Sequence, residues 1–286
     1  MTGAIQQVRL AGRDTELSGL FADTADPVAL VVALPGGGMT ARYFHGELHP
    51  SVSLLRLGSA LGYAVLALDR PGYGASTGIA DQHTTLAAQA DIIWEALQHA
   101  TLAASHVPVL LLGHSFGAMV ALQMAGRDPA PLPLWGIDFS GIGTHYAEVV
   151  LSPPPDTDLG EMHWGSRQNY PKGTFDPPHL PTARLPGVEA LEALRWQERV
   201  AAVVSAVRCP VRITVAEGEL NWINDPNDFA ALFVNAESVG VDIQPRSGHN
   251  ISLSWAARAY HLRVMAFFDD CVRLRRYLTD NPEQSR

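Results

Sequence analysis

Short, almost entirely apolar runs that end in turn residues recur along this chain and constrain its fold more than any other feature. Residues 27–34 read PVALVVAL and precede Pro-Gly-Gly-Gly, and residues 63–68 read YAVLAL and precede Asp-Arg-Pro-Gly. Residues 107–112, 134–139 and 211–215 are similar. Apolar runs of about four to eight residues closed by turn signals are typical of strands buried on both faces of a parallel sheet.

Helix-like stretches lie between these runs. Strands that alternate with helical patterns predict an α/β fold with a mostly parallel central sheet flanked by helices. Residues 6–21 are expected to form an antiparallel pair at the sheet edge. The predicted helices cover residues 51–61, 86–104, 118–125, 228–236 and 253–278.

One segment interrupts this alternation. Residues 144–186 are rich in Pro, Gly and aromatic side chains and show no strand period. A loop this long inside a domain is usually functional or disordered, and its aromatic residues argue against disorder. We expect a lid that ends in a helix over about 188–207. The chain then divides into a first core part (1–143), a lid or cap insertion (144–207) and a second core part (208–286).

Charge and cysteine content exclude several classes of protein. The chain has 286 residues and a net charge of -9, which argues against nucleic-acid and anionic-membrane partners. Cys209 and Cys271 neither form a disulfide framework nor have a metal-ligand spacing. The sequence shows no signal peptide and no apolar run long enough to span a bilayer. We expect a cytoplasmic protein without a metal or cofactor.

The strongest chemical motif is Gly113-His114-Ser115-Phe116-Gly117, which fits G-x-S-x-G. It follows a predicted strand and opens a predicted helix, the context that this motif requires. Its glycines permit a sharp turn that exposes the Ser115 hydroxyl, and the helix N-terminus places free backbone N–H groups beside it.

With this motif in place, the chain resembles an α/β-hydrolase over about residues 28–278, with the lid as the family's insertion after the sixth strand. The resemblance implies an oxyanion hole in the loop after an early strand. Gly37 matches the family's donor there, and the Phe116 N–H is the second donor. Because three glycines run together, Gly38 and Met39 are alternative donors.

The resemblance also implies a general base and an acid. His249 follows the last predicted strand and precedes the last helix, as the family's catalytic histidine does. Spacing from the preceding strand puts Glu219 at the acid position, so the triad would use glutamate instead of the commoner aspartate. Glu217, Asp225 and Asp138 are the alternatives. The order serine, acid, histidine agrees with the family.

A third group of residues is a candidate substrate pocket. These side chains could line an apolar acyl pocket or simply fill the core of the lid. They are His114, Trp164, Tyr170 and Trp222, and Met39 and Phe175 belong to the same candidate set.

These features predict a serine hydrolase that cleaves an ester or thioester of a small to medium apolar acyl group through an acyl-enzyme. The alternatives are an acyltransferase or thioesterase of a biosynthetic pathway, a carbon–carbon bond hydrolase or perhydrolase with the same triad, and a ligand receptor on this scaffold. A dehalogenase or epoxide hydrolase is disfavoured because Ser115 stands where those need aspartate. We expect a small-molecule substrate, with an acyl-carrier protein or a second copy of the chain as possible partners.

Overall fold

A computed structural model describes residues 4–76, 79–100, 107–155, 157–223 and 225–280. Within them, eight strands form one sheet in the order β1-β2-β4-β3-β5-β6-β7-β8. β2 runs antiparallel to β1 and β4, and the other neighbouring strands pair in parallel. The strands are β1 (Ile5–Ala11), β2 (Glu16–Ala22), β3 (Leu30–Leu34), β4 (Ala64–Leu68), β5 (Val109–His114), β6 (Leu134–Ser140), β7 (Val211–Gly218) and β8 (Val239–Gly248). The predicted mostly parallel sheet and its antiparallel edge pair are therefore confirmed.

The central strands are apolar on both sides because each side packs against helices. In β3, Val32 and Leu34 belong to one hydrophobic cluster, while the alternating Val31 and Ala33 belong to the other. Side chains alternate across a strand, so an uninterrupted apolar run supplies both clusters at once. This explains why these strands lack the apolar–polar alternation of a sheet with one solvated face.

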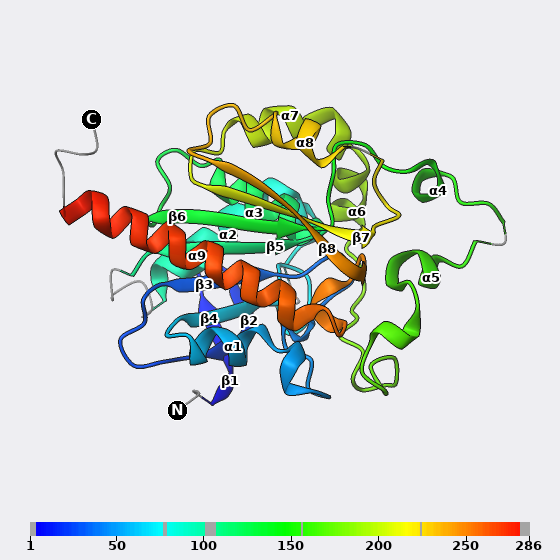
Figure 1. Cartoon of the computed structure of the whole chain (residues 1–286), viewed down its shortest axis with the longest axis horizontal. Coiled ribbons are helices and arrows are strands. Elements are labelled where there is room, and N and C mark those ends of the chain that lie inside the picture. Colours follow the sequence, from blue (N-terminus) through cyan, green and yellow to red (C-terminus); the bar gives the residue numbers. More distant parts are fainter. Residues whose placement is uncertain (1–3, 77–78, 101–106, 156, 224, 281–286) are drawn as a thin grey trace.

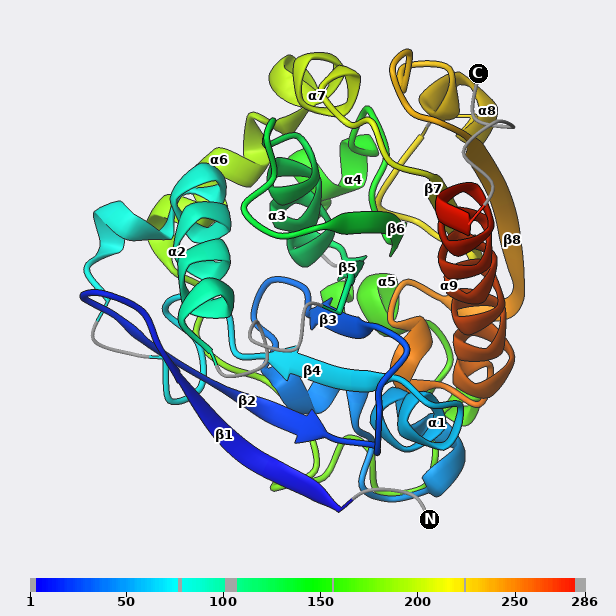
Figure 2. The same cartoon turned by 90° about the vertical axis from the view of Figure 1, so that its left-hand side faces the viewer.

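Helices cover both faces of the sheet. α1 and α9 lie on one face, and α2, α3 and α7 lie on the other (Figures 1 and 2). The helices are α1 (Leu54–Ala60), α2 (Leu86–His99), α3 (Phe116–Ala125), α4 (Glu148–Leu151), α5 (Leu159–Trp164), α6 (Gly187–Leu194), α7 (Trp196–Ser205), α8 (Pro226–Ala230) and α9 (Ala257–Asp280).

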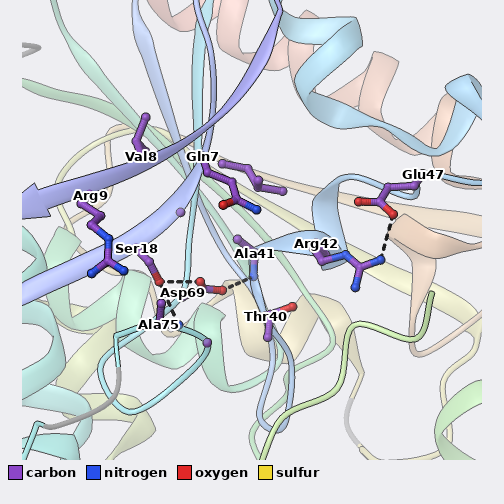
Figure 3. A pocket seen from close by; sticks show the side chains of 13 residues that line it. Gln7, Val8, Arg9, Ser18, Thr40, Ala41, Arg42, Glu47, Asp69 and Ala75 are labelled. Carbon is purple, nitrogen blue, oxygen red and sulfur yellow. Dashed lines mark hydrogen bonds and ion pairs between the residues drawn. The ribbon is translucent and has the colours of Figure 1, made fainter. Parts of the chain in front are cut away.

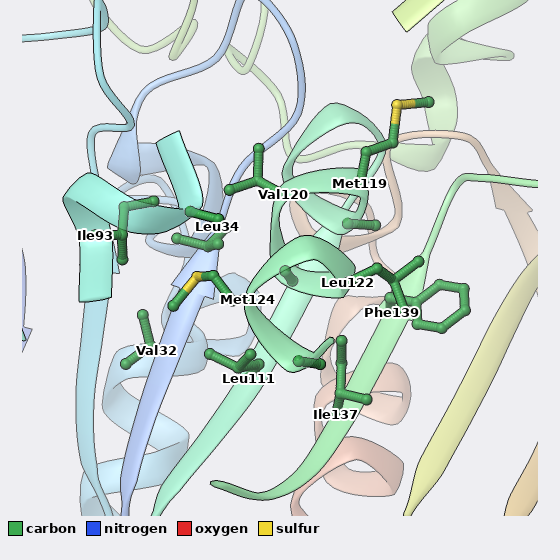
Figure 4. Packing of buried hydrophobic residues seen from close by; sticks show 14 of the residues in the cluster. Val32, Leu34, Ile93, Leu111, Met119, Val120, Leu122, Met124, Ile137 and Phe139 are labelled. Atoms are coloured by element: carbon green, nitrogen blue, oxygen red, sulfur yellow. The ribbon is translucent and has the colours of Figure 1, made fainter. Parts of the chain in front are cut away.

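α3 is apolar on nearly every side because it is enclosed between the sheet and neighbouring helices. Figure 4 shows Met119, Val120, Leu122 and Met124 of this helix among side chains of β3, β5, β6 and α2. All four are fully buried. This packing fixes the N-terminus of α3, where Ser115 lies, relative to the sheet.

Several predicted helices differ from the structure. The helix expected over 188–207 is divided at Arg195 into α6 and α7. The division directly precedes Trp196, whose buried indole N–H donates to the Gly143 carbonyl at 2.9 Å. The helix expected over 228–236 covers only Pro226–Ala230, since Asp225 caps its start and turns follow it. The helix predicted over 86–104 ends at His99, since Ala100 is extended, and residues 101–104 lie outside the described residues.

The segment between β6 and β7 contains α4, α5, α6 and α7. α4 and α5 project from the body of the molecule, while α6 and α7 pack back beside α2 and α3 (Figure 1). The segment is thus an insertion between two neighbouring parallel strands.

The two cysteines lie in the interior of the protein. Cys209 and Cys271 are buried free thiols. Over the described ranges, no cluster of three or more His, Cys, Asp and Glu side chains is arranged to hold a metal ion. None of the helices in those ranges combines the length and hydrophobicity that crossing a membrane requires.

Candidate active site

Ser115 occupies a strained corner between β5 and α3. Its backbone has φ 52° and ψ −125°, a conformation that costs a non-glycine residue of the order of 1–3 kcal/mol and that clusters at functional sites. The neighbouring glycines are required by close packing. A Cβ on Gly113 would lie 2.4 Å from Ala118 Cα, and one on Gly117 would lie 2.1 Å from the Leu34 carbonyl oxygen. The motif therefore specifies a corner that only these residue types fit.

The glycine-rich loop after β3 lies against this corner. A Cβ on Gly37 would lie 2.7 Å from the Phe116 ring, so the loop backbone approaches the start of α3 directly. The Gly38 N–H donates to the Tyr73 hydroxyl at 3.3 Å, and the Met39 N–H donates to the Gly36 carbonyl at 3.3 Å. Of the candidate oxyanion donors, only the Gly37 and Phe116 N–H groups form no hydrogen bond within the described chain.

His249 and Glu219 form a hydrogen-bonded pair at the same end of the sheet. Their side chains follow β8 and β7, and His249 Nδ1 lies 2.8 Å from Glu219 Oε2. The other carboxylate oxygen, Oε1, accepts from the backbone N–H of Asn221 at 3.0 Å and from its side-chain amide at 2.9 Å. Asn221, which sequence reasoning missed, therefore holds the carboxylate in place from the side away from the histidine.

The three alternative acids make other contacts. Glu217 accepts from the Arg246 backbone N–H at 2.7 Å. Asp225 caps α8 by accepting from the Asn227 N–H at 2.8 Å. Asp138 is buried within β6 and lies 3.0 Å from the Arg212 guanidinium. Of the four, only Glu219 is paired with His249.

Ser115 and His249 line the same cavity, which has a volume of about 390 Å³. Over the described residues, no hydrogen bond joins the Ser115 hydroxyl to His249; catalytic hydrogen bonds often tighten only when substrate binds. The insertion between β6 and β7 supplies part of the wall. The lining residues are Gly36, Gly37, Gly38, Met39, His114, Ser115, Phe116, His163, Trp164, Thr182, Ala183, Leu185, His249 and Asn250.

Burial and the charge of His249 shift the pKa values of the groups around it. Burial would raise the pKa of Glu219, but the charge of His249 and hydrogen bonds from His249 and Asn221 outweigh it, so this pKa is lowered. Burial, followed by the charge of His249, lowers the pKa of His114 and His163. The pair of His249 and ionised Glu219 is thus surrounded by imidazoles that burial keeps neutral.

His114 packs between two rings beside Ser115. Its imidazole stacks on Tyr43 with ring centroids 4.7 Å apart and lies 4.7 Å from the His249 ring. Its Nδ1 is 3.1 Å from the Ser140 hydroxyl. The geometry makes His114 part of the cavity wall behind His249.

The aromatic residues expected in the pocket separate into two groups. Trp164 lines the cavity of Ser115, as does the aliphatic side chain of Met39. Tyr170 lies behind Trp164 and donates from its hydroxyl to the Trp164 carbonyl at 2.7 Å. Trp222 does not line this cavity, because its ring stacks on Tyr146 and its N–H donates to the Gly141 carbonyl at 2.9 Å.

Sequence reasoning also missed several lining residues. His163 and Asn250 both lie in the wall, and the Asn250 amide donates to the His163 carbonyl at 3.0 Å. Thr182, Ala183 and Leu185 complete it from the insertion. Asn250 directly follows His249 and could have been found from that position. The others lie in a segment without periodicity, so no pattern marks them.

A mostly parallel sheet with a serine at a strained strand–helix corner, and a histidine–carboxylate pair at the ends of the last two strands, is the architecture of an α/β-hydrolase. Residues 31–262 match the model of the alpha/beta hydrolase family. The chain belongs to that family.

Solved structures show the same fold at low sequence identity. A thermophilic esterase from Thermogutta terrifontis is 18% identical with a TM-score of 0.67, over 93% of this chain and 99% of that one. A carboxyl esterase from Bacillus coagulans is 16% identical with a TM-score of 0.67, over 94% and 99%. A monoglyceride lipase from Saccharomyces cerevisiae is 16% identical with a TM-score of 0.70, over 94% and 95%.

One curated relative resembles part of the chain. The magnesium-chelatase 30 kDa subunit of Rhodobacter capsulatus is 34% identical over 99 residues. That match covers 34% of this chain and 34% of the relative. The similarity therefore extends over about a third of each protein.

Proposed function

We propose that this α/β-hydrolase is a serine hydrolase that cleaves an ester or thioester of a small to medium apolar acyl group. The observation that carries the proposal is the shared cavity of Ser115 and His249, with His249 bonded to Glu219 at 2.8 Å. A serine is a weak nucleophile unless an adjacent base accepts its proton, and a third group must orient that base.

In the proposed reaction, Ser115 Oγ attacks the acyl carbonyl while its proton passes to His249 Nε2. Glu219 accepts a hydrogen bond from Nδ1–H, which selects the tautomer with a free Nε2 and stabilises the imidazolium. The proton then moves to the leaving alcohol or thiol, and an acyl-enzyme remains. Water, deprotonated by the same imidazole, attacks the acyl-enzyme; the acyl–Oγ bond breaks, the imidazolium returns its proton to Ser115 Oγ, and the acid is released.

The Gly37 and Phe116 N–H groups are the proposed oxyanion donors. Their supporting feature is that both lack a hydrogen-bond partner in the described chain, whereas Gly38 and Met39 donate to groups within the protein. Removing one preorganised donor of this kind costs roughly 10²- to 10³-fold in rate.

The cavity wall favours an uncharged substrate. Among the described residues, its lining contains no arginine, lysine, aspartate or glutamate, and its polar groups are histidine, serine, threonine and asparagine. A carboxylate or phosphate at this place would lie in a partly desolvated site without a counter-charge, which is costly. A volume of about 390 Å³ suits a short to medium acyl group.

Covalent labelling tests the proposal directly. A fluorophosphonate probe should modify one residue, Ser115, stoichiometrically, and the Ser115→Ala variant should stay unlabelled. The purified protein should also hydrolyse p-nitrophenyl esters. An unmodified Ser115 at high probe concentration would contradict a serine hydrolase and favour a ligand receptor.

The choice between ester and thioester needs a second measurement. Initial rates on p-nitrophenyl esters of graded chain length are compared with rates on acyl-CoA of the same chain lengths. A falling rate beyond a given chain length is expected because the cavity has a volume of only about 390 Å³. Equal activity on all lengths would contradict an acyl-selective pocket.

A further inference from the structure

The turn after β4, residues 69–74, contacts the proposed oxyanion loop and the segments beside it. Asp69 accepts from the Ala41 N–H at 2.7 Å and from the Ser18 hydroxyl at 2.6 Å, as Figure 3 shows. The Tyr73 hydroxyl accepts from the Gly38 N–H. Figure 3 also shows a surface pocket at Asp69, and this pocket shares no lining residue with the cavity of Ser115.

Arg70 lies at the centre of this arrangement and is fully buried. Its Nε donates to the Pro35 carbonyl at 2.7 Å, and its Nη2 donates to the Gly36 carbonyl at 3.1 Å. The Gly36–Gly37 peptide is trans, so its planar geometry points the C=O and the N–H in opposite directions. A guanidinium that holds the Gly36 carbonyl therefore fixes the direction of the Gly37 N–H.

The counter-charge of Arg70 comes from the insertion between β6 and β7. Glu189 of α6 is fully buried, and its Oε1 lies 2.7 Å from Arg70 Nη2. Gln89 of α2 joins the two, because its Oε1 accepts from Arg70 Nη1 at 2.6 Å and its Nε2 donates to Glu189 Oε2 at 3.1 Å. A buried guanidinium without such a partner is strongly unfavourable.

We infer that Arg70 and Glu189 are positioning residues that aim the Gly37 N–H at the reacting carbonyl, so that docking of α6 sets the rate of the chemical step. This inference rests on the proposed function. The same insertion supplies Trp164 and Thr182 to the cavity wall, and the Ala183 N–H donates to the Gly38 carbonyl at 2.8 Å. The segment that encloses the substrate thus also holds the oxyanion loop.

The test separates positioning from stability. Replacing both charges, Arg70→Met with Glu189→Met, removes the guanidinium without leaving an unpaired buried charge, a change that often preserves folding. We expect an unfolding midpoint close to that of the wild type and a KM for p-nitrophenyl butyrate within about threefold. The kcat should fall roughly 10- to 100-fold, part of the loss that follows removal of an oxyanion donor.

The affinity for a transition-state analogue distinguishes the two roles, because a purely structural role of Arg70 would leave this affinity unchanged. Affinity for an alkyl trifluoromethyl ketone should fall by the same factor as kcat, while the affinity for the substrate stays nearly constant. If the double variant does not fold, Arg70→Lys supplies the measurement, because it keeps a positive charge opposite Glu189 of α6 but lacks the guanidinium fork that holds the Pro35 and Gly36 carbonyls. Glu192→Gln on the same helix is the matched control, since Glu192 contacts Leu86 and Arg199 instead.

The outcomes are distinct. Unchanged kcat and analogue affinity in a folded variant would overturn the positioning role and leave the hydrolase proposal intact. An equal loss in the Glu192→Gln control would also overturn it. A wild-type protein that neither reacts with fluorophosphonate nor cleaves esters would overturn both proposals together.

Discussion

At the residue scale, Ser115 is held in a backbone conformation that a side chain normally avoids. The corner persists because Gly113 and Gly117 admit Ala118 and the Leu34 carbonyl at distances that no Cβ would allow. Glu219 shows the same dependence on neighbours. Its carboxylate is divided between Asn221 on one oxygen and His249 on the other, so its orientation is set before any substrate arrives.

The first prediction concerns the acid. Glu219→Gln should lower kcat by about 10²- to 10⁴-fold, because an amide at this place no longer selects the tautomer with a free Nε2. The unfolding midpoint should change little. Steady-state kinetics on a p-nitrophenyl ester and thermal unfolding measure the two effects.

Glu217→Gln is the control for this substitution. Glu217 contacts the Arg246 backbone at 2.7 Å and not His249, so its variant should keep kcat within a few-fold of the wild type. If Glu217→Gln lost activity while Glu219→Gln kept it, the acid of the triad would be Glu217 and not Glu219.

At the scale of elements, the insertion between β6 and β7 supplies part of the wall of the cavity of Ser115. Trp164 lines the cavity of Ser115, which has a volume of about 390 Å³. It also lines a second cavity of about 420 Å³, whose wall includes Arg167 and Phe175. The Trp164 carbonyl is held in place, since Tyr170 donates to it and a Cβ on Gly248 would lie 3.2 Å from its oxygen. We propose that the indole is the wall between the two cavities.

The second prediction follows from this wall. Trp164→Ala should join the two cavities and shift the chain-length preference toward longer acyl groups. At about 0.8 kcal/mol for each newly buried CH₂, two extra methylenes correspond to roughly a tenfold rise in the ratio of kcat/KM for hexanoate over butyrate esters.

Phe175→Ala tests whether the effect is specific to the wall. Phe175 lines the second cavity and not the cavity of Ser115, so its removal should leave the chain-length preference unchanged. The same shift in both variants would indicate a loosened insertion and would contradict a dividing role for Trp164.

At the scale of the whole molecule, the sheet is stabilised by apolar clusters on both faces, and α9 covers one of them. α9 also carries a buried histidine. His261 of α9 is fully buried, and its Nε2 lies 3.1 Å from the Ser252 hydroxyl. Burial lowers the pKa of His261 to about 3 from the ordinary value of 6.5.

The third prediction is a pH dependence of stability. Between these two pKa values the unfolded chain binds a proton that the folded chain does not, so stability falls as the pH drops below 6.5 and continues to fall toward pH 3. From pH 8 to pH 5, His261 should account for a loss of about 2 kcal/mol in the free energy of unfolding.

Urea unfolding across this pH range measures the effect. His261→Gln cannot take up the proton but can still bond to Ser252 from a similar position. Its stability should therefore depend less steeply on pH between 5 and 7 than that of the wild type. Parallel curves for the two proteins would show that protonation of His261 does not contribute.

The sequence by itself determined the strands, the edge pair and the corner of Ser115. Runs such as 30–34 carry apolar side chains at every position, which only a sheet covered on both faces can bury. Gly113 and Gly117 are likewise local requirements of one turn. The contact between His249 and Glu219 agrees with the spacing from β7 and β8, since both strands end at the same edge of the sheet.

Only the tertiary structure decided how the insertion meets this edge. Residues 144–186 have no periodicity, so no pattern could tell that Trp164 faces the cavity or that Trp222 stacks on Tyr146 instead. The pairing of Arg70 with Glu189, over a hundred residues apart in the chain, has no local signal. Such contacts arise from docking of distant elements, and the free energy that selects them comes from burial and charge pairing in the folded chain.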